Sequence, residues 1–223
     1  MNIVGKRTLR STLEQKVDAH PDRPFLIFEE QDGPVSTYSY LQFDRMVNRT
    51  ANALLELGVG KGDKVHLHLI NCPEFLFLWF ATAKIGAVLM PTNPLSPPDE
   101  LSYPVHHSES VVSVTQPELL TAVQAIRERC PNLREVIVVG GGGDGEHSFA
   151  DLIDGQSTKL RDVAIDPLDE VAIMYTSGTT SKPKGVLVTN ANFVYLGEVI
   201  SRIMGLGPKD RHLVTLPLFH ANA

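Results

Sequence analysis

A short polar segment between two apolar runs, residues 175–186, holds the side chains with the clearest chemical potential. Four of its hydroxyl groups belong to Thr176, Ser177, Thr179 and Thr180. Hydroxyls and bare backbone N–H groups donate hydrogen bonds, so both suit the oxygens of a phosphate. Gly178 and Gly185 permit conformations that bring the backbone close to a ligand. Pro183 stiffens the turn that aims Lys184. We predict a phosphate-binding loop, because the simpler alternative, a polar hairpin turn, needs fewer residues.

Two other nucleotide-binding motifs have less support. A Walker loop requires Gly-Lys followed by Ser or Thr, and neither Gly-Lys pair of this chain is followed by either residue. The glycines at 140, 142 and 145 satisfy G-x-G-x-x-G after an apolar run. The dinucleotide motif also needs a helix directly behind its glycines, and the residues that follow predict none. We expect a surface loop there.

Several reactive residue types have simpler interpretations. His66 and His68 share one face of a predicted strand without a third ligand nearby, so we expect structural or pocket-lining roles. His106 and His107 are adjacent, and on a helix they cannot share a metal. Cys72 adjoins a predicted helix N-terminus, where a thiol can be acidified, but a packed thiol is the simpler prediction.

His220 and the acidic pairs complete the candidates. His220 follows an apolar run, and the carboxyl ends of strands in open α/β sheets line ligand sites. We therefore predict that it lines a pocket. The pairs Glu29–Glu30 and Asp99–Glu100 are expected to be solvated or helix-capping charges rather than a catalytic pair.

The elements that must position these residues follow from hydrophobic periodicity. Helices are predicted over Leu9–Val17, Leu41–Leu55, Pro73–Ala87, Pro98–His107, Glu118–Arg129 and Asn192–Met204. Strands are predicted over Phe25–Phe28, Val35–Tyr38, Val65–Ile70, Val88–Pro91, Val111–Val114, Val136–Val139, Val171–Tyr175, Gly185–Val188 and His212–Leu216. Pro104 is expected to bend its helix or end it early. The alternation predicts a layered α/β fold with a largely parallel sheet flanked by helices.

Composition limits the classes of function. The 223 residues carry 20 basic and 26 acidic side chains, a formal net charge of −6, which argues against nucleic acid or an anionic membrane as partner. The longest strongly apolar stretch without a charge, residues 75–83, is about half of what a membrane span requires. The first ten residues show no signal-peptide pattern, and two cysteines are too few for a disulfide framework. We expect a cytoplasmic protein without a transmembrane segment.

The segment 176–185, Thr-Ser-Gly-Thr-Thr-Ser-Lys-Pro-Lys-Gly, resembles the phosphate-binding signature of the adenylate-forming (AMP-binding) superfamily. That superfamily includes acyl-CoA synthetases, peptide-synthetase adenylation domains and luciferases. Further similar segments, in the family's usual order, are 37–41, 51–54, 58–63, 71–74, 84–87, 91–94 and 217–220. Two positions depart from the pattern, since Ser181 stands where most members have glycine and Pro104 interrupts a segment that is usually plain helix. Within the family, residues 71–75, His68, Trp79, Phe80 and Ser181 look most like the crotonobetaine/carnitine-CoA ligases.

The resemblance implies a two-step reaction that uses ATP, Mg²⁺ and coenzyme A. A carboxylic acid first forms an acyl-adenylate and pyrophosphate, and a thiol then displaces AMP to give a thioester. The implied ligands of the ATP phosphates are Thr176, Ser177, Gly178, Thr179, Thr180 and Lys184. Lys184 is also the implied catalytic residue, and His220 the implied acyl-pocket residue. The family's ribose-binding aspartate, magnesium-binding glutamate and adenylation lysine lie further along the chain, so we name no metal ligand here.

The same resemblance implies a division of the chain and leaves alternatives open. Residues 1–165 are expected to form a first α/β subdomain. Residues 166–223 are expected to hold the strand–loop–strand unit, a helix and the start of a second subdomain. We expect a truncated N-terminal portion of the large domain, because the last predicted strand lacks a covering helix. The alternatives are a non-catalytic nucleotide-binding fragment and an adenylating enzyme that serves a carrier protein. A homo-oligomer is possible, and the acid substrate cannot be read from these residues.

Overall fold

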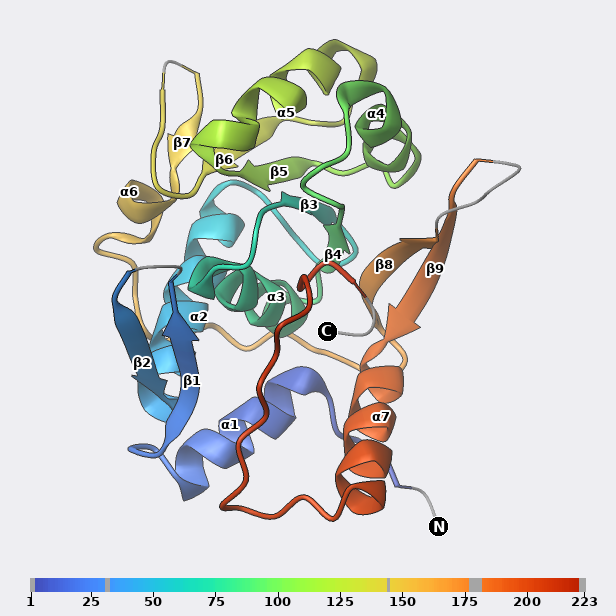
Figure 1. The fold of residues 1–223 in the computed structure, drawn as a ribbon. Coiled ribbons are helices and arrows are strands. Elements are labelled where there is room, and N and C mark those ends of the chain that lie inside the picture. Colours follow the sequence, from blue (N-terminus) through green and yellow to red (C-terminus); the bar gives the residue numbers. More distant parts are fainter. Residues whose placement is uncertain (1–2, 31–32, 144, 177–181, 221–223) are drawn as a thin grey trace.

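The structure, a computed structural model, describes residues 3–30, 33–143, 145–176 and 182–220. Its main feature is a seven-stranded sheet that lies between helices (Figure 1). The strand order is β7-β6-β5-β3-β4-β8-β9, and every neighbouring pair is parallel except β8 with β9. The predicted layered α/β fold with a largely parallel sheet is confirmed.

The element boundaries agree closely with the periodicity of the sequence. The strands of the main sheet are β3 (Lys64–His68), β4 (Val88–Pro91), β5 (Val112–Thr115), β6 (Glu135–Val138), β7 (His147–Ser148), β8 (Glu170–Thr176) and β9 (Lys184–Thr189). The α-helices are α1 (Leu9–Ala19), α2 (Tyr40–Glu56), α3 (Pro73–Ile85), α4 (Pro98–His107), α5 (Leu120–Ile126), α6 (Phe149–Ile153) and α7 (Asn190–Ile203). Two single-turn 3₁₀ helices, Pro117–Leu119 and Arg127–Arg129, flank α5.

A separate antiparallel hairpin, β1 (Pro24–Glu29) and β2 (Val35–Ser39), lies beside α2 (Figure 1). Aromatic rings attach it to the helices. The Phe25 ring centroid is 4.5 Å from that of Phe43 on α2, and Tyr38 meets Phe77 on α3 edge-on at 5.2 Å. A capping box between Ser39 and Gln42 is present where the hairpin runs into α2.

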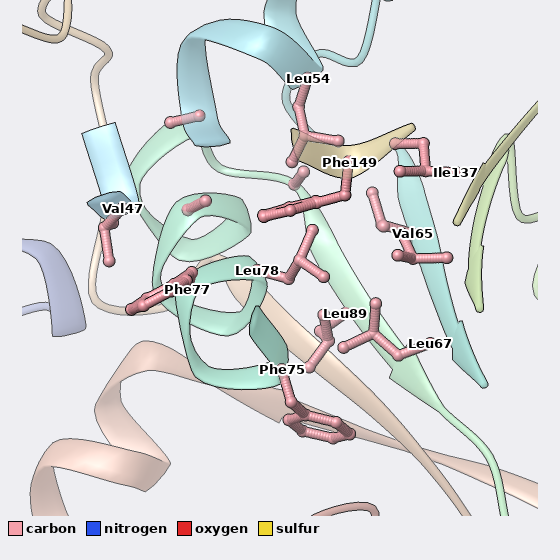
Figure 2. Packing of buried hydrophobic residues seen from close by; sticks show 14 of the residues in the cluster. Val47, Leu54, Val65, Leu67, Phe75, Phe77, Leu78, Leu89, Ile137 and Phe149 are labelled. Atoms are coloured by element: carbon pink, nitrogen blue, oxygen red, sulfur yellow. The ribbon is translucent and has the colours of Figure 1, made fainter. Parts of the chain in front are cut away.

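The main sheet has a hydrophobic cluster on each face. The larger one joins α2, α3 and α6 to the strands and includes Val47, Leu54, Val65, Leu67, Phe75, Phe77, Leu78, Leu89, Ile137 and Phe149 (Figure 2). The second joins α4 and α5 to the other face through Val88, Met90, Leu101, Val105, Val123, Ile126 and Ile173. Burial on both faces explains why β4 and β6 read as continuous apolar runs, whereas β3 and β5 alternate apolar with buried polar side chains.

Helix α3 is buried between layers, as its apolar sequence predicts. Its one buried charge is compensated. The ammonium of Lys84, whose side chain is 1% exposed, lies 2.5 Å from Oδ1 of Asp44 and 2.9 Å from Oδ1 of Asn48, both on α2. The helix ends at Gly86, whose φ of 74° is in the left-handed region that favours glycine.

The structure corrects one predicted strand. Residues 212–216 form no strand, because a strand needs a neighbouring backbone and no described strand pairs with them. The carbonyl of Leu216 instead accepts a hydrogen bond from Nδ2 of Asn71, and the N–H of Leu218 donates to Oδ1 of the same side chain. The Asn71 side chain therefore binds the end of this segment and the residue that follows Pro217.

Two helical predictions also differ in detail. Helix α4 runs through Pro104 to His107, since Pro104 is buried beside Leu101 and Val105 and this packing offsets the lost backbone hydrogen bond. The helix expected over 118–129 tightens to 3₁₀ geometry at both ends. The sequence analysis missed β7 and α6. Because β7 separates the glycine run from α6, no helix opens directly behind the glycines, as predicted.

Candidate phosphate-binding hairpin

The polar segment 175–186 lies at the tip of the β8–β9 hairpin. The two strands are antiparallel, with Tyr175 opposite Gly185 and Thr176 opposite Lys184. The two apolar runs are therefore strands, as predicted. Four of the predicted phosphate ligands, Ser177, Gly178, Thr179 and Thr180, lie outside the described residues.

The two predicted phosphate ligands that the structure describes lie at opposite ends of the intervening loop. Thr176 ends β8, Lys184 begins β9, and both are exposed. The Thr176 hydroxyl donates to the Lys184 carbonyl over 3.5 Å. Within the described part of the chain no carboxylate pairs with the Lys184 ammonium. A hydroxyl and a lysine cation without an ion-pair partner among the described residues thus flank the loop, and the cation suits an anion.

The hairpin is attached to the sheet at its base. Between β8 and β4 the registered pair is Leu89 with Ala172, and the strands β8 and β9 then extend beyond the sheet toward the tip (Figure 1). Ile173 packs into the second hydrophobic cluster next to this pair. The base is thus fixed by strand pairing and by apolar packing.

Gly185 has a packing role that its sequence context does not reveal. Its φ lies outside the left-handed region. A Cβ atom at this position would lie 2.9 Å from Cγ2 of Ile173 and 3.3 Å from Cζ of Tyr175. The missing side chain makes room for these two residues of β8 rather than for an unusual backbone conformation.

The sequence analysis missed a contact between this hairpin and α4. The Tyr175 hydroxyl lies 2.7 Å from Nδ1 of His107, which is 68 residues away in the chain. Burial, with the neighbouring Tyr103 as a second cause, raises the pKa of Tyr175 to about 12, so the phenol keeps its proton. The phenol can therefore donate to the imidazole.

His66 and His68 are structural, one of the two predicted roles. Both are fully buried. Nδ1 of His66 lies 2.8 Å from Oγ of Ser113, and the Thr92 hydroxyl lies 2.9 Å from Nε2 of His66 and 3.0 Å from Nδ1 of His68. Burial lowers the pKa of His68 to about 4, and burial together with His68 lowers that of His66 well below its usual value. Both rings are neutral at pH 7.

Cys72 is a packed thiol, as predicted. Its side chain is buried next to the first turn of α3. Burial, followed by the nearby Glu74 carboxylate, raises the pKa of the thiol to about 12. The helix N-terminus therefore does not activate it.

An open groove of about 2030 Å³ lies over the carboxyl ends of β3, β5 and β6. Its other walls are the β1–β2 hairpin and residues 207–215. No described residue that lines it belongs to β8 or β9, so the groove and the β8–β9 hairpin are separate features.

His220 is exposed and does not line the groove. Its role in an acyl pocket stays a prediction.

Residues 13–223 match the sequence model of a family described as AMP-binding enzyme. The chain belongs to this family. It is 37% identical, over 99% of its length, to a crotonobetaine/carnitine–CoA ligase of Escherichia coli O17:K52:H18 (strain UMN026 / ExPEC). It spans 44% of the length of that relative.

Solved structures of AMP-binding enzymes have the same fold. The N-terminal domain of FACL13 from Mycobacterium tuberculosis superimposes on 96% of the chain with a TM-score of 0.85 at 27% identity, and the chain covers 52% of it. The anthranilate CoA ligase AuaEII, in complex with anthranoyl-AMP, superimposes on 83% with a TM-score of 0.77 at 28% identity, and the chain covers 35% of it. This AMP-binding chain thus has the architecture of CoA ligases over the portion that it spans.

Proposed function

We propose that this chain is the N-terminal part of an AMP-forming acid–thiol ligase that joins a small carboxylic acid to coenzyme A. The observation that carries the proposal is the 37% identity to a crotonobetaine/carnitine–CoA ligase over 99% of the chain. The anthranilate CoA ligase AuaEII, solved with anthranoyl-AMP, supports an adenylate intermediate. We infer a cytoplasmic protein. None of the helices in the described ranges is both long and apolar enough to cross a membrane.

In the proposed first step, the carboxylate attacks the α-phosphorus of ATP and pyrophosphate leaves. Thr176 and Lys184, with Ser177, Gly178, Thr179 and Thr180 between them, hold the phosphates. Their hydrogen bonds and the Lys184 charge favour the transition state if they strengthen as negative charge develops on the leaving oxygens. In the second step the coenzyme A thiol attacks the acyl carbon and AMP leaves.

Mg²⁺ would neutralise phosphate charge during the first step. In the described ranges there is no cluster of three or more His, Cys, Asp or Glu side chains that could hold an ion. We therefore assign no residue of this chain to the metal.

The boundary between residues 165 and 166 stays a prediction. Strands β8 and β9, which follow this boundary, extend the same sheet as β3 to β6, which precede it.

The experiment that tests the proposed function is product analysis with a full-length protein that begins with this chain. The protein is incubated with ATP, Mg²⁺, coenzyme A and single acids, including crotonobetaine, carnitine and fatty acids of different length. We expect equal amounts of AMP and acyl-CoA with at least one acid. Formation of ADP, or of acyl-adenylate that coenzyme A does not consume, would contradict it. The second of these results would favour a carrier-protein acceptor.

A further inference from the structure

One face of α4 meets the phosphate hairpin through aromatic rings. Tyr103 and His107 are one helical turn apart, and their rings are stacked with centroids 5.2 Å apart and an interplanar angle of 28°. The Tyr175 ring of β8 meets both edge-on, at 6.5 Å from Tyr103 and 5.9 Å from His107. The hydrogen bond between the Tyr175 hydroxyl and His107 Nδ1, 2.7 Å long, fixes the orientation of the Tyr175 side chain relative to α4.

The same helix also contacts the other end of the loop. The Lys182 ammonium lies 5.1 Å from the centroid of the Tyr103 ring, within the range of a cation–π interaction. Tyr175 precedes the undescribed residues 177–181 and Lys182 follows them. Both ends of the loop are thus held by two neighbouring side chains of α4.

These contacts matter because the sheet supports only the base of the hairpin. The registered pair with β4 is at Ala172, and Tyr175 lies three residues further along β8. At about 3.3 Å per residue, this places Tyr175 about 10 Å beyond the paired position. Gly185 leaves the space in which the Tyr175 ring lies. The α4 side chains thus support the hairpin closer to its tip than the registered pair with β4 does.

We propose that Tyr103 and His107 are positioning residues for ATP, acting through Lys182 and Tyr175. They set the places of Tyr175 and Lys182 relative to the main sheet. The inference rests on the proposed function, to which it adds a second layer of residues. Neither residue is assigned a contact with substrate, so their loss changes how well Thr176 and Lys184 meet the phosphates and leaves the acid site unaffected.

The test is steady-state kinetics of the full-length ligase with variants on both sides of the contact. His107→Ala and Tyr175→Phe each remove the hydrogen bond, and Tyr175→Phe keeps the ring. We expect each to raise the KM for ATP about threefold to tenfold, the ratio that corresponds to one lost hydrogen bond. The kcat and the KM for the acid are expected to stay within about twofold of the parent. His107→Asn, whose amide can reach the position of Nδ1, is expected to restore most of the loss.

Two comparisons separate positioning from a general loss of structure. His106→Ala changes the adjacent exposed histidine and is expected to match the parent. The double variant His107→Ala/Tyr175→Phe is expected to resemble either single variant, because both remove one interaction. A KM for ATP equal to that of the parent, a parallel rise in the KM for the acid, or additive effects in the double variant would overturn the inference.

A direct measurement of ATP binding distinguishes failure of this inference from failure of the proposed function. The Kd for ATP, measured by calorimetry without acid or coenzyme A, is expected to rise in His107→Ala by the same factor as KM. If the parent binds ATP but forms no AMP with any acid, the proposed ligase function fails while the positioning role is still decided by the Kd values. A parent that does not bind ATP would overturn both.

Discussion

Lys184 is the residue on which the proposed chemistry depends most. It is exposed at the start of β9 and lies opposite Thr176. In the full-length ligase we expect Lys184→Ala to lower the rate of acid-dependent pyrophosphate release about 10²–10³-fold, as loss of one preorganised electrostatic partner does elsewhere. The fold is expected to be unchanged, because the side chain is not part of either hydrophobic cluster. Lys159→Ala removes another exposed lysine and serves as the control for net charge. A Lys184→Ala rate within about threefold of the parent would contradict the assignment.

The buried histidines make stability depend on pH. His68 has a folded pKa of about 4, below the usual value of 6.5, so the unfolded chain binds a proton that the folded chain does not. The contribution of neutral His68 to the free energy of unfolding is fully present above pH 6.5. It is lost as the pH falls toward 4, at up to about 1.4 kcal/mol per pH unit. His66 adds to the loss in the same direction. We expect the melting temperature to fall over this range.

The variant His68→Asn isolates this contribution. Its amide can still donate to the Thr92 hydroxyl but does not titrate. The melting temperature of this variant is expected to fall less steeply than that of the parent between pH 6.5 and pH 4. Parallel pH profiles for the two proteins would show that His68 does not carry the effect.

At the scale of single residues, the sequence could identify the hydrogen-bond donors of the candidate phosphate site but not the side chains that hold the site in place. The phosphate-binding hypothesis needs only local order, a run of hydroxyls, glycines and lysines within ten residues. The contact of Tyr175 with His107 joins positions 68 residues apart, and no local spacing signals it. The packing role of Gly185 was hidden for the same reason, since it depends on side chains across the hairpin.

At the scale of elements, the β8–β9 hairpin offers a direct test through Gly185. We expect Gly185→Ala to destabilise the protein by about 1–3 kcal/mol, because the new Cβ would overlap Cγ2 of Ile173 in a packed cluster. Ile173→Leu, which moves the branch away from Cβ, is expected to recover part of the loss. Denaturant unfolding measures both effects.

Gly197→Ala is the matched control for this prediction. Gly197 lies inside α7, and a Cβ there would have nothing within 4 Å. Alanine is expected to stabilise the helix by up to about 1 kcal/mol. If the two alanine variants change stability in the same direction, the packing explanation for Gly185 is wrong.

The contact between α2 and α3 depends on the buried pair of Lys84 and Asp44. Lys84→Met leaves the Asp44 carboxylate without its cation, and we expect a loss of about 3–5 kcal/mol in the free energy of unfolding. The double variant Lys84→Met/Asp44→Leu removes both charges and is expected to recover most of this loss. Denaturant unfolding measures these free energies. A free energy of unfolding of Lys84→Met close to that of the parent would contradict this account.

Element types were predicted well because the apolar periodicity is strong and most helices have clear start and stop residues. The predictions failed where tertiary contacts, rather than the local sequence, determine the structure. The strand expected over 212–216 has no partner backbone among the described residues, and Asn71 bonds to the end of this segment instead. Pro104 stays inside α4 because buried neighbours compensate for it. Strand order within the sheet could not be predicted, since alternating strands and helices are compatible with several orders.

At the scale of the whole molecule, the central claim is that this chain supplies the phosphate-binding part of a larger ligase. The chain spans 44% of the related crotonobetaine/carnitine–CoA ligase. By the family resemblance, the residues that contact ribose and magnesium lie beyond it. Phosphate contacts alone are exposed to water, where charge interactions are heavily screened. We therefore expect residues 1–223 by themselves to bind nucleotide weakly and to be inactive.

Acid-dependent exchange between ATP and labelled pyrophosphate tests the central claim most directly, because it reports the adenylation step without coenzyme A. It is measured for the full-length protein, for its Lys184→Ala variant and for residues 1–223 alone, with the same acids in each case. We predict exchange in the full-length protein with at least one acid, a rate about 10²–10³-fold lower in Lys184→Ala, and none in residues 1–223. No exchange in the full-length protein with any acid, or exchange that Lys184→Ala leaves unchanged, would contradict the account.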